Sequence, residues 1–271
     1  MKNMERIAII ILMLTLPLLL GASNENETKD SAGQIQEKNP TDKHSDQKKI
    51  GDIATTPNVT RNVTDKPLYK PPLRGSPAGR VGGGTRGTER ESFLLMVLAP
   101  DHVGLTIHDQ PSLYWFISKP TTYPVELTVI ERNAVQPLLE KILKSPEKGG
   151  IQSLRLADYG VRLRIGIQYK WFVTLVTDAA HRSKDILAGG IITLVDAPLS
   201  LPAKLESAGS SGAYFVYAEE GLWYDSLDAV SRMIDAAPTN LELHKQRAAL
   251  LEQVGLSEVA AFEDSQQPSS R

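Results

Sequence analysis

The stretch at residues 169–175 reads YKWFVTL, and it decides the fold class of this 271-residue chain. Tyr169, Trp171, Val173 and Leu175 recur at every second position. A period of two puts alternate side chains on opposite faces of an extended chain, as in a strand with one buried face. The sequence therefore predicts a β-strand here, with Trp171 packed in the protein interior.

Neighbouring segments show the same period and extend the prediction from one strand to a sheet. In the run PVELTVIER, the apolar Val125, Leu127 and Val129 alternate with polar residues. Strands are predicted at residues 92–98, 112–118, 124–132, 161–167, 169–175 and 190–195. About six or seven strands separated by Pro and Gly signals are typical of an immunoglobulin-like β-sandwich. A barrel built from the same strands is the alternative.

The hydrophobic period becomes helical after Pro198. Two helices are predicted at residues 210–221 and 223–237, because Gly221 breaks the first and Pro238 stops the second. A third, amphipathic helix is predicted at residues 241–254 and caps the other two. The positions that resemble a tetratricopeptide-type hairpin are Tyr217, Gly221, Ser226 and Pro238.

The predicted fold is thus mainly β with an α-helical C-terminus: an immunoglobulin-like β-sandwich followed by a tetratricopeptide-like helical hairpin. Composition and periodicity divide the chain into five parts. They are a signal peptide at residues 1–23, a disordered tether rich in Pro, Gly and Lys at 24–90, the β-sandwich domain at 91–198, the helical hairpin with its capping helix at 199–258, and a disordered tail at 259–271.

The N-terminus has the pattern of a secretory signal peptide. Lys2 and Arg6 precede an apolar run at residues 7–20, and the small residues Gly-Ala-Ser follow it. An uncleaved anchor is the alternative, but a spanning helix needs about 20 apolar residues and Pro17 interrupts this run. We therefore expect the segment to be cleaved and the protein to be secreted, with no membrane insertion after cleavage.

The segment after the signal peptide is polar and, in its second half, basic. Residues 61–90 carry seven Lys or Arg against two acids, whereas the whole chain has a formal net charge of −2. Such polar segments bury too little apolar surface to offset their ordering entropy. A solvated linker is the preferred interpretation, and contact with an anionic envelope polymer is the alternative. The overall charge does not indicate a nucleic-acid partner.

Residues 75–87 read GSPAGRVGGGTRG and raise the question of a phosphate-binding loop. The glycines have the P-loop spacing, but Thr85 and Arg86 stand where that motif needs Lys followed by Ser or Thr. A tether precedes the motif and a predicted strand follows it, which is also the wrong setting. We interpret these residues as a junction into the first strand, with Arg80 and Arg86 anchoring it against the domain.

Other catalytic signatures are incomplete. The Gly209–Gly212 tetrapeptide is one residue too short for a nucleophile elbow, and Ser145 and Lys148 match S-x-x-K without a following K-T-G. The chain has no Cys, and its five His form no H-E-x-x-H pair. The sequence therefore predicts no enzyme, and no catalytic, cofactor-binding or metal-binding residue.

The aromatic residues form three groups, and each group has either a packing role or a binding role. Two trios lie in predicted strands, where they form either core or a stacking platform for sugars or bases: Tyr114, Trp115 and Phe116, and Tyr169, Trp171 and Phe172. A third group near the helical hairpin either holds the helices together or lines a partner groove: Tyr217, Trp223 and Tyr224. Periodicity favours the core interpretation for the trios. Separately, Arg182 and Asp185 are spaced to close a turn.

Taken together, the motifs resemble the bacterial family named domain of unknown function 928, over residues 71–256. The motifs that carry the resemblance are GRVGGGTRG at 79–87, the LAP and GLT steps at 98–100 and 104–106, PSLYWF at 111–116, the segment from YKW at 169–171 through Asp178 and HRSKD at 181–185 to Gly190, and GLWYDSLDAV at 221–230.

The resemblance implies an exported bacterial protein, periplasmic or secreted, with a β-rich body and a short helical C-terminus. The family has no established activity, and its genes tend to lie near envelope sensor and repeat-protein genes. Family members often carry Cys before Asp178, where this chain has Thr177. A redox role at that position is therefore not available here.

Three hypotheses follow for the function. The leading one is a non-enzymatic protein-interaction module with a protein partner in the cell envelope. The alternative is a module that binds an envelope polymer such as a carbohydrate, and the second alternative is an unrecognised hydrolase. Ligand, partner and oligomeric state are not predicted.

Overall fold

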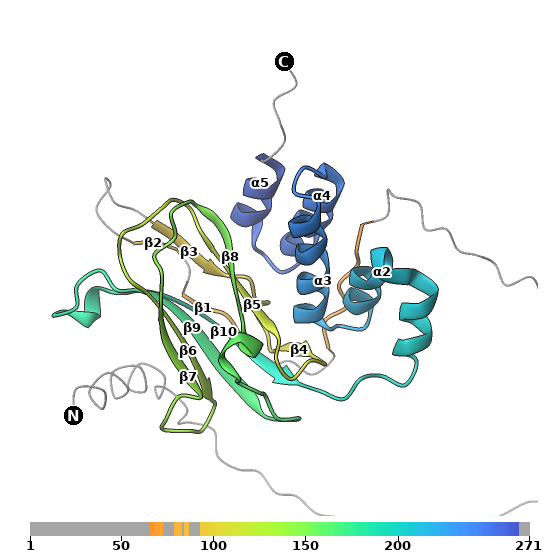
Figure 1. Cartoon of the computed structure of the whole chain (residues 1–271), viewed down its shortest axis with the longest axis horizontal. Helices are drawn as coiled ribbons and strands as arrows, with labels where there is room; N and C mark the ends of the chain where they lie inside the picture. Colours follow the sequence, from red (N-terminus) through yellow and green to blue (C-terminus); the bar gives the residue numbers. More distant parts are fainter. Residues whose placement is uncertain (1–65, 73–78, 83, 87–92, 266–271) are drawn as a thin grey trace, which may run out of the picture. The chain divides into compact units, whose positions relative to one another are not determined.

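Two β-sheets and four C-terminal helices make up the described part of the chain (Figure 1). The computed structural model describes residues 66–72, 79–82, 84–86 and 93–265, all of which belong to one unit that begins at Lys66. The predicted mainly β body with a helical C-terminus is thus confirmed. The predicted signal peptide and most of the predicted tether lie outside the described residues, whereas the immunoglobulin-like and tetratricopeptide-like types stay predictions.

The larger sheet has the strand order β1-β10-β9-β6-β7, and β4 pairs with β10 in parallel. These strands are β1 (Val81–Gly82), β4 (Gly104–Thr106), β6 (Val125–Glu131), β7 (Leu139–Leu143), β9 (Gln168–Leu175) and β10 (Ile186–Leu194). The central strand β9 contains the YKWFVTL stretch, and Trp171 lies between Val129 of β6 and Gly190 of β10. Its side chain is fully buried, as predicted.

The smaller sheet has the order β2-β3-β5-β8. Its strands are β2 (Gly84–Arg86), β3 (Phe93–Val97), β5 (Ser112–Ile117) and β8 (Gly150–Arg155). All six residues of β5 are buried. Tyr114 and Phe116 meet the helices through Asp228 and Phe262, whereas Leu113 and its same-face neighbours pack in the core shared with the larger sheet. A strand covered on both faces has no polar side, so SLYWFI shows no clear alternation.

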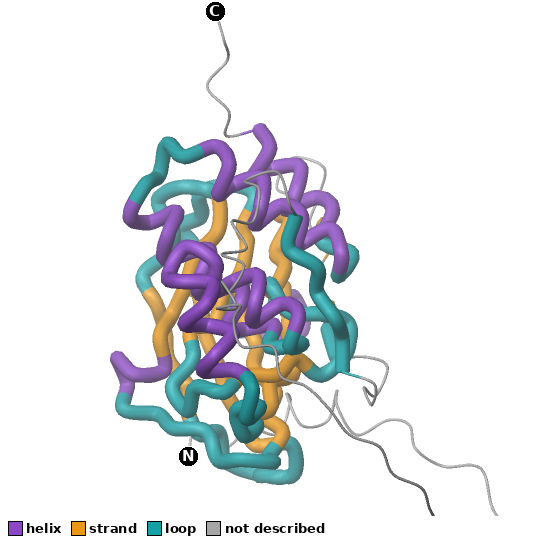
Figure 2. Tube along the Cα trace, turned by 90° about the vertical axis from the view of Figure 1, so that its right-hand side faces the viewer, coloured by secondary structure: helices purple, strands orange, loops and turns teal. Residues whose placement is uncertain are grey.

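The helices lie together on one side of the strands (Figure 2), where α3 contacts β4 of the larger sheet and β5 of the smaller one. They are α2 (Leu201–Glu219), α3 (Trp223–Ala236), α4 (Leu241–Gln253) and α5 (Ser257–Ser265). Helix α2 begins earlier than predicted and is interrupted at Gly209, whose φ of 65° is left-handed backbone that favours glycine. Asn240 caps α4, because its side chain accepts from the backbone N–H groups of Glu242 and Leu243. None of the described helices is long and apolar enough to cross a membrane.

Three sequence predictions need correction. The predicted strand at residues 161–167 is wrong: Val161 and Leu163 are buried, but Ile165 is exposed and meets Leu194 only in an isolated bridge. The N–H groups of Val161 and Leu163 donate to Leu156 O and Asp109 O, at 3.1 and 2.7 Å, so no continuous ladder forms. The predicted tail from residue 259 is wrong as far as Ser265, because α5 packs Val259 and Ala260 into the core.

The third correction concerns the predicted tether at 24–90, which is wrong for its described residues. Tyr69 is buried, its N–H donates to the Gln253 side chain at 2.9 Å, and its hydroxyl bonds to His102 at 2.9 Å. Lys70 N–H donates to Ala218 O at the end of α2, at 3.0 Å. This segment is extended without periodic apolar residues, so composition alone does not reveal its contacts.

The glycine-rich junction is also part of the fold. Gly79 N–H donates to Asp101 O at 2.6 Å, and a Cβ on Gly79 would lie 2.0 Å from the carbonyl oxygen of His102. Arg80 donates to Ala99 O and Val254 O, both at 3.1 Å, and so joins β1 to the end of α4. The predicted anchoring role of Arg80 is confirmed, whereas the side chain of Arg86 lies outside the described residues.

Candidate functional site

Aromatic side chains form a joint between the larger sheet and the N-terminal end of α3. Trp171 Nε1 donates to the Tyr224 hydroxyl at 2.9 Å, and that hydroxyl donates to Ile191 O at 3.1 Å. Trp223 Nε1 donates to Leu98 O at 2.9 Å. Both helical aromatics are buried, so they hold the helices on the sheet. The two strand trios are buried too, which contradicts an exposed stacking platform.

A buried carboxylate extends this joint to the loop after β4. Asp225 lies in the first turn of α3, where the helix dipole favours an anion. It accepts from the Thr106 hydroxyl at 3.1 Å, from Ile107 N–H at 3.2 Å, and from Nδ1 of His108. Burial raises the pKa of Asp225, although its hydrogen bond to His108 acts in the opposite direction.

His108 is the exposed half of this pair. Its side chain is 60% exposed, whereas that of Asp225 is 1% exposed. The hydrogen bond to Asp225 raises the pKa of His108 more than burial lowers it. A carboxylate-supported imidazole resembles the base of a hydrolytic triad. The other partners of this pair, however, are the Thr106 hydroxyl and the Ile107 N–H, and both contacts hold the loop. We therefore interpret the pair as a structural contact that holds the loop after β4 against α3.

The remaining described histidines are also paired with acids. His102 bonds to Asp101, His181 to Asp178, and His244 to Glu263. Among the described residues, no three His, Asp or Glu side chains come together as a metal site. The predicted turn pair is confirmed, because Arg182 Nε lies 2.7 Å from Asp185 Oδ2.

Strand β8 presents an unpaired edge. It is the last strand of its sheet, and the hydrogen bonds of β5 show which way its backbone points. Leu98 N–H donates to Tyr114 O at 2.8 Å and Ser118 N–H donates to Leu94 O at 3.0 Å, so the even-numbered residues of β5 bond to β3. Successive residues of a strand bond to opposite neighbours. Trp115 therefore bonds to its partner Gln152 in β8.

The same ladder leaves the odd-numbered residues of β8 facing outward. The N–H and C=O groups of Ile151 and Ser153 point away from β5, and neither residue has a backbone hydrogen bond to another described residue at this edge. The sequence here is Gly-Gly-Ile-Gln-Ser at residues 149–153, without a charged side chain. Charged side chains are the usual protection of a sheet edge against pairing with other chains.

A polar groove of about 230 Å³ lies between this edge and the helices. The cross-strand pairs Tyr114↔Ser153 and Phe116↔Ile151 put these side chains on the helix-facing side of the sheet. The opposite wall comes from α3, α4 and α5, with Ser231, Asp235, His244, Arg247, Phe262 and Glu263. The groove therefore combines free backbone groups with polar side chains.

Glu263 organises the floor of this groove. Its carboxylate accepts from Nε and Nη2 of Arg247, at 3.0 and 2.8 Å, and from Nδ1 of His244 at 2.9 Å. Arg247 also donates to the Ser231 hydroxyl at 3.2 Å. A buried ion pair is tolerated only where hydrogen bonds satisfy both partners, as they do here. The charged side chains of the floor therefore bond to one another. Asp235, at the rim of the groove, is exposed.

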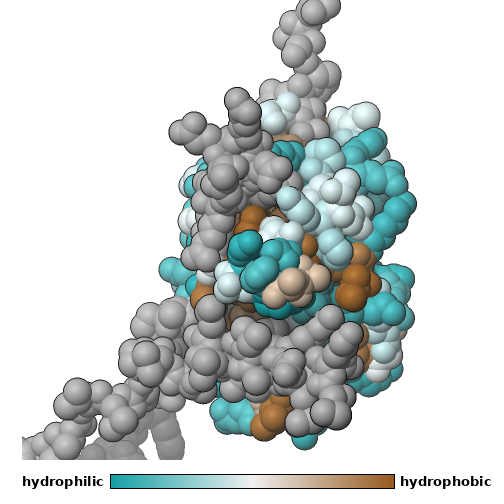
Figure 3. Space-filling view, turned by 90° about the vertical axis from the view of Figure 1, so that its left-hand side faces the viewer, coloured by the Kyte–Doolittle hydropathy of each residue, from teal (hydrophilic) through white to brown (hydrophobic). Residues whose placement is uncertain are grey.

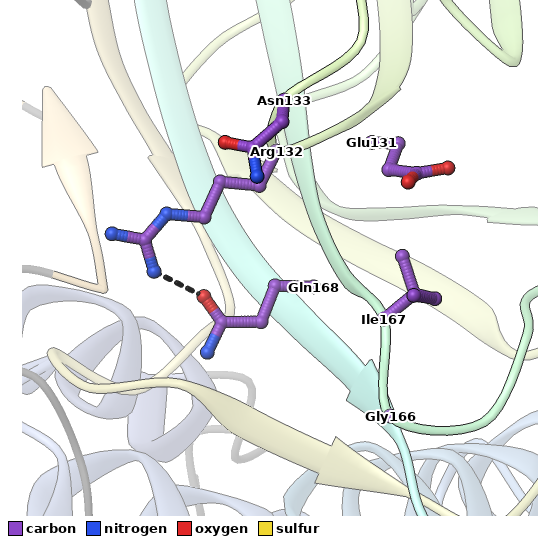
Figure 4. Close-up of a pocket in the computed structure, with 6 residues that line it drawn as sticks. All are labelled: Glu131, Arg132, Asn133, Gly166, Ile167 and Gln168. Atoms are coloured by element: carbon purple, nitrogen blue, oxygen red, sulfur yellow. Dashed lines mark hydrogen bonds between the residues drawn. The ribbon is translucent and has the colours of Figure 1, made fainter.

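Two larger depressions are weaker candidates. One, of about 480 Å³, lies at the turn beside β6 and β9, and Figure 4 shows the side chains of Arg132 and Gln168 pointing toward one another, with Nη1 of Arg132 2.5 Å from Gln168 Oε1. Glu131 is paired with Arg164. The other, of about 500 Å³, is lined by residues 119–123 with Pro146 and Glu147. Neither combines an unpaired strand edge with a helical wall.

The outer strand of the larger sheet, β7, is a protected edge. Glu140 and Lys141 are exposed on it, and Lys144 follows it. Exposed apolar side chains occur near this edge at Leu138 and Ile142. On the face in Figure 3, hydrophobic residues appear as separate brown areas between hydrophilic ones. Strand β8 is therefore the better candidate for pairing with another chain.

Sequence reasoning missed this groove. Strand β8 was not predicted, because Gly-Ile-Gln-Ser-Leu-Arg at residues 150–155 lacks an alternating apolar pattern. The helical half was predicted as a groove only through Tyr217, Trp223 and Tyr224. The two residues Trp223 and Tyr224 are buried at the joint, and Tyr217 is half-buried with its ring against His108. The available signal was the run Gly-Gly-Ile-Gln-Ser at residues 149–153, which lacks the charged side chains that usually protect a sheet edge.

Comparisons with known proteins place the chain in a family. A family model described as Domain of Unknown Function (DUF928) matches residues 81–263. A search of curated proteins finds no match. Among solved structures, a multi-domain immunophilin from Arabidopsis thaliana is similar at a TM-score of 0.15 and 9% identity, over 58% of this chain and 94% of that one, which is too slight to carry an argument. The family match confirms the resemblance seen in the motifs, and the chain belongs to the DUF928 family.

Proposed function

We propose that this chain is a non-enzymatic protein-interaction module of the bacterial cell envelope that binds an extended segment of a partner along β8. The observation that carries the proposal is the outward-facing backbone of Ile151 and Ser153 beside a polar groove. A strand edge of this kind recognises a peptide through main-chain hydrogen bonds, and the adjoining groove selects its side chains.

The energetic requirements of this binding mode fit the groove. Each intermolecular hydrogen bond contributes about 0.5–1.5 kcal/mol net, so several outward groups are needed to offset the ordering of a flexible segment. Residues 150–153 belong to β8, which pairs with the fully buried strand β5, so the geometry of this edge is already ordered. Little of the binding free energy is lost in ordering this side of the complex.

Export and location are part of the proposal. They are supported by the signal-peptide pattern at residues 1–23 and by the tether that follows it. In this proposal the helical hairpin and its capping helix act as the wall of the groove, in keeping with the tetratricopeptide-like spacing, and the immunoglobulin-like sandwich acts as its rigid support.

The alternatives receive less support from the described residues. Polymer binding was based partly on exposed aromatic strands, and both trios are buried. A hydrolase was based on scattered acids and histidines, and His108 with Asp225 is the one described pair of that kind with an exposed imidazole and a buried carboxylate. Its other contacts hold the loop after β4.

The test is a selection of random 12-residue peptides displayed on phage, with the full chain as bait. We expect enrichment of extended, alternating sequences that bind the native chain and fail to bind Ser153→Pro. Proline there removes an outward N–H without breaking the ladder, and sheet edges tolerate it.

The matched control is Glu140→Pro on β7. Arg132 N–H donates to Gln168 O, at 2.9 Å, so the even-numbered residues of β6 bond to β9 and Glu140 faces outward on β7 by the same ladder rule. This control should retain the selected peptides. Enrichment of no peptide, or of peptides that bind Ser153→Pro and the native chain equally, would contradict the proposed function.

A further inference from the structure

We infer that the segment bound along β8 is basic, and that a Lys or Arg side chain of this segment lies against Asp235 at the rim of the groove. This inference rests on the proposed function and adds the chemistry of the partner. It follows from the charges on the groove wall and from the direction in which side chains of an added strand would point.

The wall formed by α3 presents a stripe of three residues toward the smaller sheet: Asp228, Ser231 and Asp235. Their spacing of three and four residues puts them on one helix face. Asp228 accepts from the Tyr114 hydroxyl at 2.9 Å and pairs with Arg232 at 2.7 Å. Ser231 accepts from Arg247. Asp235 has no ion pair or hydrogen bond to another described residue, so its charge is available at the groove.

Asp235 also lies near the C-terminal end of α3, where the helix dipole is negative. It lies in the last turn of α3, which carries no basic residue. The C-terminal end of a helix is the negative end of its dipole, because the last carbonyl groups have no intrahelical partner. Asp235 therefore adds a negative charge to a negative helix end, and a cation supplied by a partner would be favoured there.

The basic side chains of the groove do not compete for this role. Arg247 uses its Nε and both Nη atoms on Glu263 and Ser231. His244 has one ring nitrogen on Glu263 and the other on Pro238 O, at 3.0 Å. Both side chains are therefore directed at their own partners, and Asp235 sets the sign of charge that an incoming side chain meets.

The register of an added strand brings its side chains to this wall. In a sheet, residues opposite one another on neighbouring strands have their side chains on the same face. Ile151 and Ser153 have their side chains on the helix-facing side. The residues of a partner that pair with them also point toward α3, where the long stems of Lys and Arg cross the groove and keep the charge at its wet rim.

The test uses the full chain and three fluorescein-labelled octapeptides of alternating Thr and Val that carry Lys, Gln or Glu at one central position. Dissociation constants are measured by fluorescence anisotropy. We expect the Lys peptide to bind about threefold to fivefold more tightly than the Gln peptide, as for an exposed charge pair, and the Glu peptide to bind most weakly. The Lys preference should shrink at high salt.

Variants separate this inference from the proposed function. Asp235→Asn should remove the difference between the Lys and Gln peptides and leave the affinity for the Gln peptide unchanged, and Asp235→Lys should make the Glu peptide the tightest. Glu206→Gln on α2, an exposed acid that does not line the groove, is the charge control and should keep the Lys preference. Ser153→Pro should weaken all three peptides.

The remaining outcomes would overturn the inference alone, the proposed function, or both. Equal affinity for the Lys and Gln peptides on the native chain, or a Lys preference that persists in Asp235→Asn, would overturn the inference while leaving peptide binding intact. No binding of any peptide, or binding unaffected by Ser153→Pro, would overturn the proposed function itself. A native dimer in analytical ultracentrifugation that Ser153→Pro converts to monomer would show that a second copy of the chain occupies β8, and would overturn both.

Discussion

The two ends of helix α3 differ in how their polar groups are used. At the N-terminal end, Trp223, Tyr224 and Asp225 are buried, and each donates to or accepts from the sheet or its loops. At the C-terminal end, Asp235 is exposed and without a partner among the described residues, beside the unpaired edge of β8. One helix therefore joins a closed structural contact to an open groove.

This difference shows where stability and binding reside. Buried polar groups must find partners, because an unsatisfied buried group costs about 1–3 kcal/mol. Groups at a wet rim carry no such cost, since water solvates them until a partner replaces it. Substitutions at the N-terminal end should therefore change the free energy of unfolding, and substitutions at the C-terminal end should change binding.

The largest effect is expected for Trp171→Ala. This change removes a fully buried side chain and leaves the Tyr224 hydroxyl without its donor. We expect a loss of about 3–5 kcal/mol in the free energy of unfolding, measured by urea denaturation. Trp171→Phe, which keeps most of the volume but not the donor, should lose less. An unchanged denaturation midpoint for Trp171→Ala would show that this joint does not hold the helices on the sheet.

A smaller effect is expected from pH. The pKa values of both His108 and Asp225 are raised in the folded chain, so the folded state binds protons more tightly than the unfolded state. The stability that protonated His108 contributes is fully present below pH 6.5, its ordinary pKa, and is lost as pH rises through the raised value. Because the imidazole is largely exposed, we expect a loss below about 1 kcal/mol.

The measurement for this pair is the free energy of unfolding between pH 5.5 and 8.5, taken at about half-unit steps. His108→Gln is the control, since Gln can still donate to Asp225 but does not titrate. The free energy of unfolding of the native chain should fall with rising pH. In His108→Gln it should fall less steeply, because the contribution of the imidazole is missing. An identical slope in both proteins would assign the pH dependence to other groups.

The smallest effect on stability is expected at the open end of α3. Asp235→Asn removes a negative charge from the negative end of the helix, without disturbing an ion pair among the described residues. We expect thermal denaturation to give a change within about 0.5 kcal/mol, in the stabilising direction. A clear destabilisation would mean that Asp235 has a structural partner, and the contrast between the two ends of the helix would then fail.

Local patterns predicted several elements correctly. Strands β3, β5 and β6 lie within the predicted segments, β9 begins one residue before its segment, and helices α3 and α4 nearly coincide with theirs. These elements carry strong periodic signals or clear stop residues such as Pro238. Strand β8 and the contacts of Tyr69 were missed, because each depends on neighbours that are distant in sequence: β5 for the strand, and Gln253 and His102 for the tyrosine.

The sequence by itself determined the class of the fold, the burial of Trp171 and the membership of the DUF928 family, because periodicity and ordered motifs are local properties of the chain. Only the tertiary structure decided which strand lies at an edge and which acids lack a partner. Both depend on what approaches a residue from elsewhere in the chain. The groove at β8 exists because α3, α4 and α5 pack beside a strand that has no neighbouring strand on its outer side among the residues that the structure describes.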